Sequence, residues 1–117
     1  MPRPRLENCV DYIEFPAKSI KATKAFYRKV FRWKFKDYGP SYTCFADGRL
    51  TGGFTTDAKS KRGGAIVIVY TSKLEALQKK VIAAKGKITQ AIFAFPGGRR
   101  FHFTDPSGNE LGVWSDK

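Results

Sequence analysis

The side chains of this sequence that could do chemistry are few. His102 is the only histidine and the best candidate for a general base, because an imidazole titrates near neutral pH. Glu14 is a second candidate for proton transfer, and Cys44 is the one thiol that we would test as a nucleophile. No serine or cysteine lies beside His102 in the sequence, so no catalytic pair can be read from adjacent residues. The sequence alone therefore leaves open whether the protein is an enzyme.

Strands and helices must position these groups, and the composition supports a folded domain. The chain has 117 residues, of which 42% are hydrophobic, and no apolar run is long enough to cross a membrane. Cys9 and Cys44 are too few for a disulfide scaffold and lack the spacing of a metal site. The basic N-terminal segment has no apolar signal core. We therefore expect one cytoplasmic domain with no membrane partner.

The chain is strongly basic, with 22 Lys and Arg residues against 10 acidic residues and a formal net charge of +12. Such a charge attracts nucleic acids, anionic surfaces and anionic small molecules. Many of the basic residues fall on two predicted helices, where a solvated face is the simpler interpretation. A basic nucleic-acid-binding module remains an alternative, although it is not the favoured one.

The C-terminal sequence predicts a β-hairpin. Apolar and polar residues alternate on both sides of an Asp-Pro-Ser-Gly-Asn turn at 105–109. One face of the predicted hairpin is apolar and consists of Phe101, Phe103, Leu111 and Val113. The other face carries His102, Glu110, Gly112 and Trp114. The first face suits packing under a helix, so we expect function on the second.

The rest of the chain predicts the order β-α-β-β-β twice. The first repeat consists of strand 10–15, helix 19–32 capped by Ser19, and strands 33–36, 41–46 and 50–55. A polar, basic segment at 56–64 is the best linker candidate. The second repeat consists of strand 65–70, a helix that ends at Gly86, strand 87–91, a loop or irregular strand at 92–98 and the hairpin. A capping box at Ser72 to Glu75 opens the second helix, and Leu74, Leu77, Val81 and Ile82 form its apolar stripe.

Several segments resemble the vicinal oxygen chelate superfamily, which includes glyoxalase I, bleomycin-resistance proteins, fosfomycin-resistance enzymes and extradiol dioxygenases. They are Ala-Phe-Tyr-Arg-Lys-Val-Phe-Arg-Trp at 25–33, Asp-Tyr-Gly at 37–39, Gly-Gly-Phe at 52–54 and the hairpin turn with its second strand at 105–114. The resemblance implies an α+β fold in which two tandem β-α-β-β-β modules form a cleft-shaped mixed sheet with helices on the outer face. The resemblance covers about Val10 to Trp114, and we expect one domain, 1–117, with an internal repeat at about 10–55 and 65–114. Arg32 stands where the family usually has glycine, which predicts a helix end without its usual left-handed residue.

The metal enzymes of this superfamily hold a divalent ion with four inward-facing His or Glu side chains. By the resemblance these positions fall on Tyr12, on the strand 50–55, on Ala65 and on Gly112, and none offers a nitrogen or carboxylate donor. Glu14, His102 and Glu110 have the same strand parity but lie one pleat away. We therefore expect no metal and no cofactor.

Without a metal, the resemblance implies a small-molecule-binding protein. The residues expected to line its cleft are Tyr12, Glu14, Val67, Val69, His102, Glu110 and Trp114, with Arg100 at the rim. A net charge of +12 suits an anionic or neutral aromatic ligand better than a cationic antibiotic of the bleomycin type. The alternative is an enzyme of the same fold, a lyase, isomerase or dioxygenase relative, that uses His102 and Glu14 or an unexpected metal. Members of this superfamily are often homodimers, and we expect one here.

Overall fold

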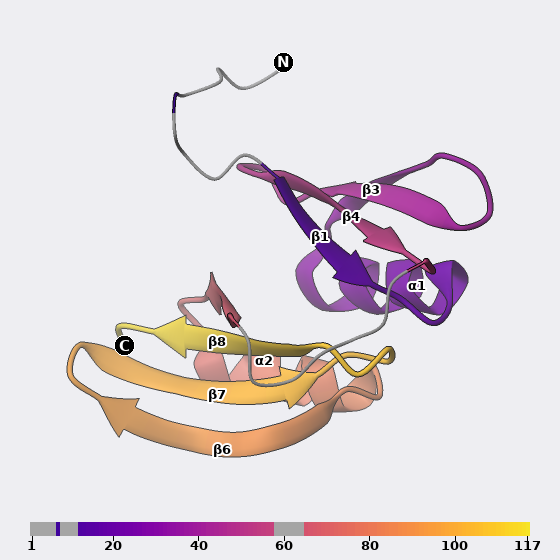
Figure 1. Ribbon diagram of the computed structural model, residues 1–117. Helices are drawn as coiled ribbons and strands as arrows, with labels where there is room; N and C mark the ends of the chain where they lie inside the picture. The colour runs from indigo at the N-terminus through magenta and orange to yellow at the C-terminus, as the bar shows by residue number, and fades with distance from the viewer. Residues whose placement is uncertain (1–6, 8–11, 58–64) are drawn as a thin grey trace. The chain divides into compact units, whose positions relative to one another are not determined.

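The computed structural model describes residue 7 and residues 12–57 and 65–117, and it divides into two compact units, Met1–Lys59 and Ser60–Lys117. Each unit contains one helix and one four-stranded mixed sheet in the order β-α-β-β-β (Figure 1). The predicted α+β class with two repeated modules is confirmed. Among the described residues, no helix is long and apolar enough to span a membrane.

The first unit consists of β1 (Tyr12–Pro16), α1 (Ile20–Phe31), β2 (Lys34–Asp37), β3 (Tyr42–Ala46) and β4 (Thr51–Thr55). Its strands are ordered β1-β4-β3-β2, with β1 parallel to β4 and the other pairs antiparallel. Residues 10 and 11 of the predicted first strand lie outside the described residues, as do residues 58–64 of the predicted linker.

Helix α1 covers one face of this sheet through aromatic packing (Figure 1). Tyr27 of the helix and Phe54 of β4 are fully buried, with ring centroids 5.0 Å apart. Phe15 stacks on Phe54 at 5.2 Å, and Trp33 stacks on Tyr27 at 4.8 Å. Because side chains alternate along a strand, residues of the other parity occupy the opposite face, which we call the first open face.

The two ends of α1 show one confirmed prediction and one wrong one. Ser19 is the N-cap, and its hydroxyl accepts a hydrogen bond from the Ala22 N–H at 3.1 Å. Arg32 itself adopts the left-handed conformation, with φ 61°, and its N–H donates to the Arg28 carbonyl. The left-handed residue predicted to be missing is therefore present without glycine. The conformation turns the chain so that Trp33 enters the core, and this burial offsets a backbone cost of about 1 kcal/mol.

The second unit consists of β5 (Val67–Tyr70), α2 (Leu74–Ala83), β6 (Lys87–Phe95), β7 (Gly98–Thr104) and β8 (Glu110–Ser115), with the sheet order β5-β8-β7-β6. The apolar core under α2 includes Leu74, Val81, Phe101, Phe103, Leu111 and Val113. The apolar face predicted for the hairpin is therefore the buried face.

Helix α2 begins one residue later than predicted. Its N-cap is Lys73, whose side chain makes no capping hydrogen bond, so the capping box predicted at Ser72 is wrong. Instead the Thr71 hydroxyl accepts from the Lys73 N–H at 3.1 Å, which holds the chain in a turn just before the helix. Ile82, placed on the buried stripe from its spacing, is 55% exposed.

Strand β6 continues through the segment predicted to be irregular. It pairs with β7 up to Phe95, with shifts in register between Ile88 and Gln90 and between Gln90 and Phe93. Each bulge changes which side of the strand the next residues face, and the sequence therefore lacks a regular alternation although the strand is continuous. Pro96 and Gly97 form only the turn into β7.

Candidate functional site

The first open face carries a compact group of polar side chains from β1 and β3, on either side of β4. Strand pairing aligns Glu14 of β1 with Gly53 of β4 and Gly53 with Cys44 of β3. Tyr12 and Tyr42 lie on the same face by strand parity. Tyr12 and Glu14 therefore lie on the face predicted for them.

These side chains form a hydrogen-bonded chain with a definite direction. The Tyr42 hydroxyl donates to Glu14 Oε2 at 2.8 Å. Because that hydroxyl has a single proton, its oxygen accepts from the Tyr12 hydroxyl, 2.6 Å away. The Tyr12 oxygen in turn accepts from the Cys44 thiol, at 3.2 Å from Sγ. The order Cys44, Tyr12, Tyr42, Glu14 is a path along which a proton can be passed to the carboxylate.

Gly53 makes this arrangement sterically feasible. A Cβ at this position would overlap the Tyr42 hydroxyl and lie 2.6 Å from the Tyr12 hydroxyl. The two phenol groups therefore occupy space that any other residue would fill. Burial, followed by hydrogen bonding to Cys44 and Tyr42, raises the pKa of Tyr12 above its usual value. Burial is also the largest cause that raises the pKa of Tyr42, so both phenols stay protonated and can act as hydrogen-bond donors.

The open face of the second sheet, which we call the second open face, contains two cross-strand rows. The aromatic row crosses β5, β8, β7 and β6 and consists of Tyr70, Trp114, Arg100 and Phe93. The histidine row crosses the same strands and consists of Ile68, Gly112, His102 and Gln90. This face places His102, Trp114 and Arg100 together, as their strand parity predicts.

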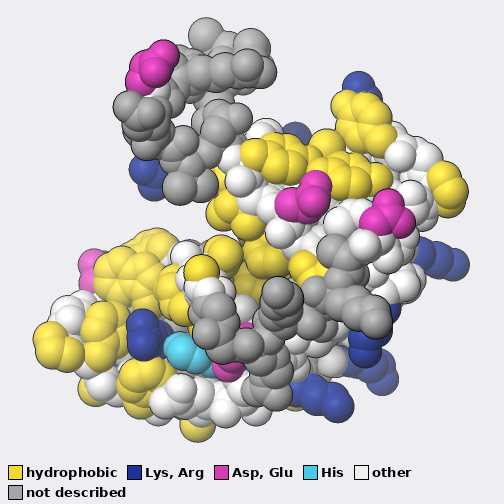
Figure 2. All heavy atoms as spheres, in the orientation of Figure 1, with side chains coloured by type: hydrophobic (Ala, Val, Ile, Leu, Met, Phe, Trp, Pro, Cys, Tyr) yellow, Lys and Arg dark blue, Asp and Glu magenta, His cyan; other side chains and the backbone are white. Residues whose placement is uncertain are grey.

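The rings of the second open face contact one another. Trp114 meets Tyr70 and Phe95 edge to face, with centroids 5.2 and 6.2 Å apart. Phe93 meets the His102 ring at 5.9 Å. Figure 2 shows the single histidine, in cyan, beside a basic side chain and hydrophobic side chains. The result is a partly exposed aromatic surface that surrounds one imidazole and one guanidinium.

His102 and Glu110 are neighbours without a direct hydrogen bond. His102 Nδ1 lies 3.8 Å from Glu110 Oε2, and that carboxylate oxygen accepts from the Thr89 hydroxyl at 2.9 Å. His102 Nε2 is buried and has no hydrogen-bond partner among the described residues. Nε2 lies against Gly112, where a Cβ would come within 3.5 Å of it.

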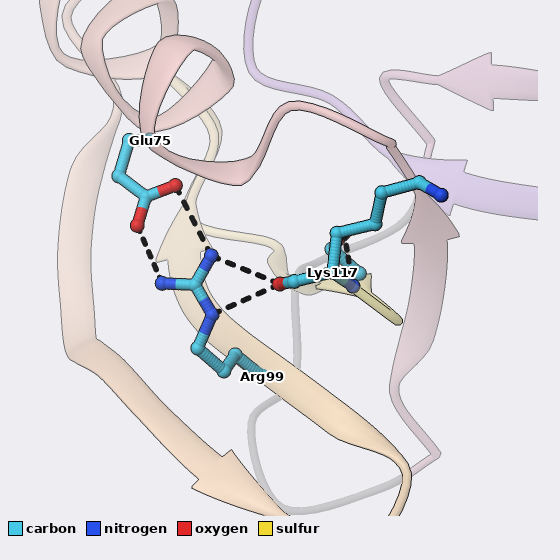
Figure 3. A network of polar contacts seen from close by, with 4 residues as sticks. Glu75, Arg99 and Lys117 are labelled. Atoms are coloured by element: carbon cyan, nitrogen blue, oxygen red, sulfur yellow. Dashed lines mark hydrogen bonds and ion pairs between the residues drawn. The ribbon is translucent and has the colours of Figure 1, made fainter.

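Two adjacent arginines of β7 face opposite sides of the sheet. Arg99 donates from Nη2 to Glu75 Oε1 at 3.2 Å and from Nε to the Lys117 carbonyl at 3.1 Å, and its Nη1 also bonds Glu75 (Figure 3). Arg100 makes no ion pair with any described residue, and its Cζ lies over the rings of Phe93 and Phe95. Arg99 thus ties α2 to the sheet, whereas Arg100 belongs to the second open face.

The comparisons with known proteins agree with this architecture. Residues 10–113 match the model of the Glyoxalase/Bleomycin resistance protein/Dioxygenase superfamily. The chain belongs to this superfamily. No curated protein matches it significantly.

Solved structures of superfamily members share the fold at low identity. A glyoxalase-related enzyme from Fulvimarina pelagi has a TM-score of 0.80 and 18% identity over 92% of this chain and 88% of that chain. An E126Q mutant of the fosfomycin resistance protein FosX from Listeria monocytogenes, complexed with Mn(II) and 1S,2S-dihydroxypropylphosphonic acid, has a TM-score of 0.80 and 15% identity over 93% and 90%. Lactoylglutathione lyase from Agrobacterium tumefaciens has a TM-score of 0.72 and 17% identity over 95% and 96%.

Strand β5, the first strand of the second unit, corrects two sequence predictions. Val67 pairs with Leu111 and Val69 with Val113, so both valines lie on the helix-facing side and do not join His102. Ile68 and Tyr70 take the positions predicted for them. The error arose because all residues of β5 are apolar or aromatic, so its parity could not be read from the sequence. The metal-ligand position that opens the second unit was counted back from the helix cap. Because that cap is Lys73 and not Ser72, the position falls on Ile66 and not on Ala65.

Several residues of the two open faces were missed from the sequence. Tyr42 was not proposed because its partners lie 28 and 30 residues away in the chain, beyond any local pattern. Phe93 and Phe95 were missed because their segment was predicted to be irregular. The spacing of two aromatic residues at 93 and 95 was the one signal that could have placed them on a strand face.

Proposed function

We propose that this superfamily member is a metal-independent binding protein for a small anionic or neutral aromatic molecule, held on the second open face. The observation that carries the proposal is the contact of the Trp114 ring with the rings of Tyr70 and Phe95 on this face. Rings that lie side by side on a sheet face, with a few polar groups between them, provide the stacking and orientation that small ligands need.

The residues at the superfamily's metal positions do not fit a metal centre. Tyr12 and Gly112 supply no nitrogen or carboxylate, and the same holds for Ile66 and the residues of β4. A side chain at Gly112 would meet Ile68 Cδ1 at 2.7 Å from its Cβ and the His102 ring at 3.2 Å. Across the described residues, no three His, Cys, Asp or Glu side chains lie close enough to hold an ion.

The two tryptophans provide an internal test of where the ligand binds. Trp114 lies on the second open face, whereas Trp33 is buried in the core of the first unit. We expect 2-naphthoate and its neutral amide, 2-naphthamide, to shift the indole N–H resonance of Trp114 in ¹H–¹⁵N spectra and to leave that of Trp33 in place. Absence of a Trp114 shift with both compounds at millimolar concentration would contradict the proposal.

A further inference from the structure

We propose that Arg100 and His102 together form an oxyanion-binding site, and that the ligand is an aromatic carboxylate, a planar ring that carries a carboxylate group. This inference rests on the proposed function, since it assigns a chemical class to the ligand of the same face. It requires the ligand to carry a negative charge, which an aromatic surface alone does not require.

The contrast between Arg99 and Arg100 is the first argument. Both belong to β7, but Arg99 is saturated by the Glu75 carboxylate and the Lys117 carbonyl (Figure 3). Apart from the strand pairing of its backbone, the Arg100 guanidinium has no ion pair with any residue that the structure describes, and its buried Nε has no hydrogen-bond partner there. A guanidinium stays charged at every physiological pH, and a partly buried one is costly without an acceptor. An anionic ligand is the chemistry that would compensate it.

The surroundings of Arg100 are the second argument. Its Cζ lies 5.2 Å from the Phe93 ring centroid and 5.4 Å from that of Phe95. Strand pairing also aligns Arg100 with Trp114 on β8. Rings that contact the guanidinium stabilise its charge and fix its plane. A guanidinium held in this way can direct its N–H groups at a carboxylate as a two-pronged donor.

Two buried nitrogens supply the third argument. Arg100 Nε and His102 Nε2 are both buried and have no hydrogen-bond partner among the described residues. Buried polar atoms are nearly always paired, so two unpaired nitrogens on one face point to a bound acceptor. The two residues are next but one in β7 and therefore lie on the same face, about 7 Å apart along the strand. Both nitrogens lie below the exposed surface, so a carboxylate accepts from both once the two side chains turn toward it.

The nearby rings define the rest of the ligand. Phe93 and Phe95 lie against the guanidinium and Trp114 contacts Phe95, so a carboxylate that reaches Arg100 brings its own substituent against aromatic side chains. A planar ring stacks on these groups with little loss of conformational freedom. The class that fits both requirements is an aromatic carboxylate.

The test compares the dissociation constants of 2-naphthoate and 2-naphthamide, measured by calorimetry for the full chain and two variants. For the natural sequence we expect naphthoate to bind roughly 10- to 100-fold more tightly than the amide, the range of a charge-assisted hydrogen bond. Arg100→Gln should abolish this preference and leave amide binding within about twofold. Arg99→Gln is the matched control and should retain the preference, because Arg99 faces the other side of the sheet.

The outcomes separate the two proposals. Equal affinity for naphthoate and naphthamide, or a preference that survives in Arg100→Gln, would overturn the oxyanion site while the aromatic binding face stands. Failure of both compounds to bind the natural sequence would overturn both. Thermal unfolding of each variant confirms that it is folded. Arg100→Lys supplies a second readout, because lysine keeps the positive charge but cannot donate two parallel N–H bonds to one carboxylate, so it should bind naphthoate with intermediate affinity.

Discussion

At the scale of single residues, the first open face places two phenol groups where each donates a hydrogen bond. Tyr42 donates to Glu14, and Tyr12 donates to Tyr42. Burial is the largest cause that favours the protonated form of both phenols, and hydrogen bonds add to it, with Cys44 and Tyr42 for Tyr12 and with Glu14 for Tyr42. The physical consequence is a raised pKa for both groups.

This arrangement predicts how alkaline pH affects the protein. Since the pKa of Tyr12 is higher in the folded than in the unfolded chain, its contribution to stability is complete below about pH 10 and is lost as pH rises through the folded value. The difference in absorbance at 295 nm between the natural protein and Tyr12→Phe should therefore titrate above pH 10. Tyr38→Phe, which removes an exposed tyrosine of the same unit, is the control. A Tyr12 midpoint at or below pH 10 would show that the hydrogen-bonded chain does not form.

At the scale of elements, the hairpin β7–β8 depends on one buried carboxylate in its turn. Asp105 Oδ1 accepts from the N–H groups of Ser107 and Asn109, both at 2.9 Å, and Oδ2 accepts from Asn109 Nδ2 at 3.0 Å. Gly108 adopts a φ of 90°, as the turn requires. The turn sets the register that places His102 beside Gly112.

Asp105→Ala should lower the free energy of unfolding by about 3 kcal/mol, because it leaves buried donors without an acceptor. Urea denaturation measures the change. Pro106→Ala, at an exposed position of the same turn, is the control and should cost less than about 0.5 kcal/mol. A similar small loss for Asp105→Ala would mean that the turn is held by other contacts.

The elements also show what could be predicted from the sequence. The hairpin and the helix capped by Ser19 were predictable, since local turn chemistry and regular alternation determine them. The side of the sheet on which Val67 lies could not be predicted. Every residue of β5 is apolar or aromatic, so no alternation of apolar and polar residues marks its two sides. The register shifts of β6 interrupt its alternation, so Phe93 and Phe95 could not be placed on a strand face. The hydrogen bond of Tyr42 to Glu14 joins two strands that only the tertiary fold brings together.

At the scale of the whole molecule, the net charge of +12 restricts the ligand. A long-range positive potential lowers the local concentration of cations and raises that of anions. We therefore expect no binding of cationic glycopeptides of the bleomycin type in calorimetric titrations at low ionic strength, where repulsion is least screened. Micromolar affinity for such a compound would contradict this charge argument.

The central claim, that the second open face binds an aromatic ligand without a metal, is tested most directly by one titration. The full chain is treated with a chelator, its metal content is measured, and 2-naphthoate is titrated by calorimetry before and after addition of Mn(II). We predict a dissociation constant on the order of 0.1 mM that is unchanged by the ion. Binding that appears only with stoichiometric metal, and is lost again in His102→Ala, would contradict the claim and favour a metal-dependent enzyme.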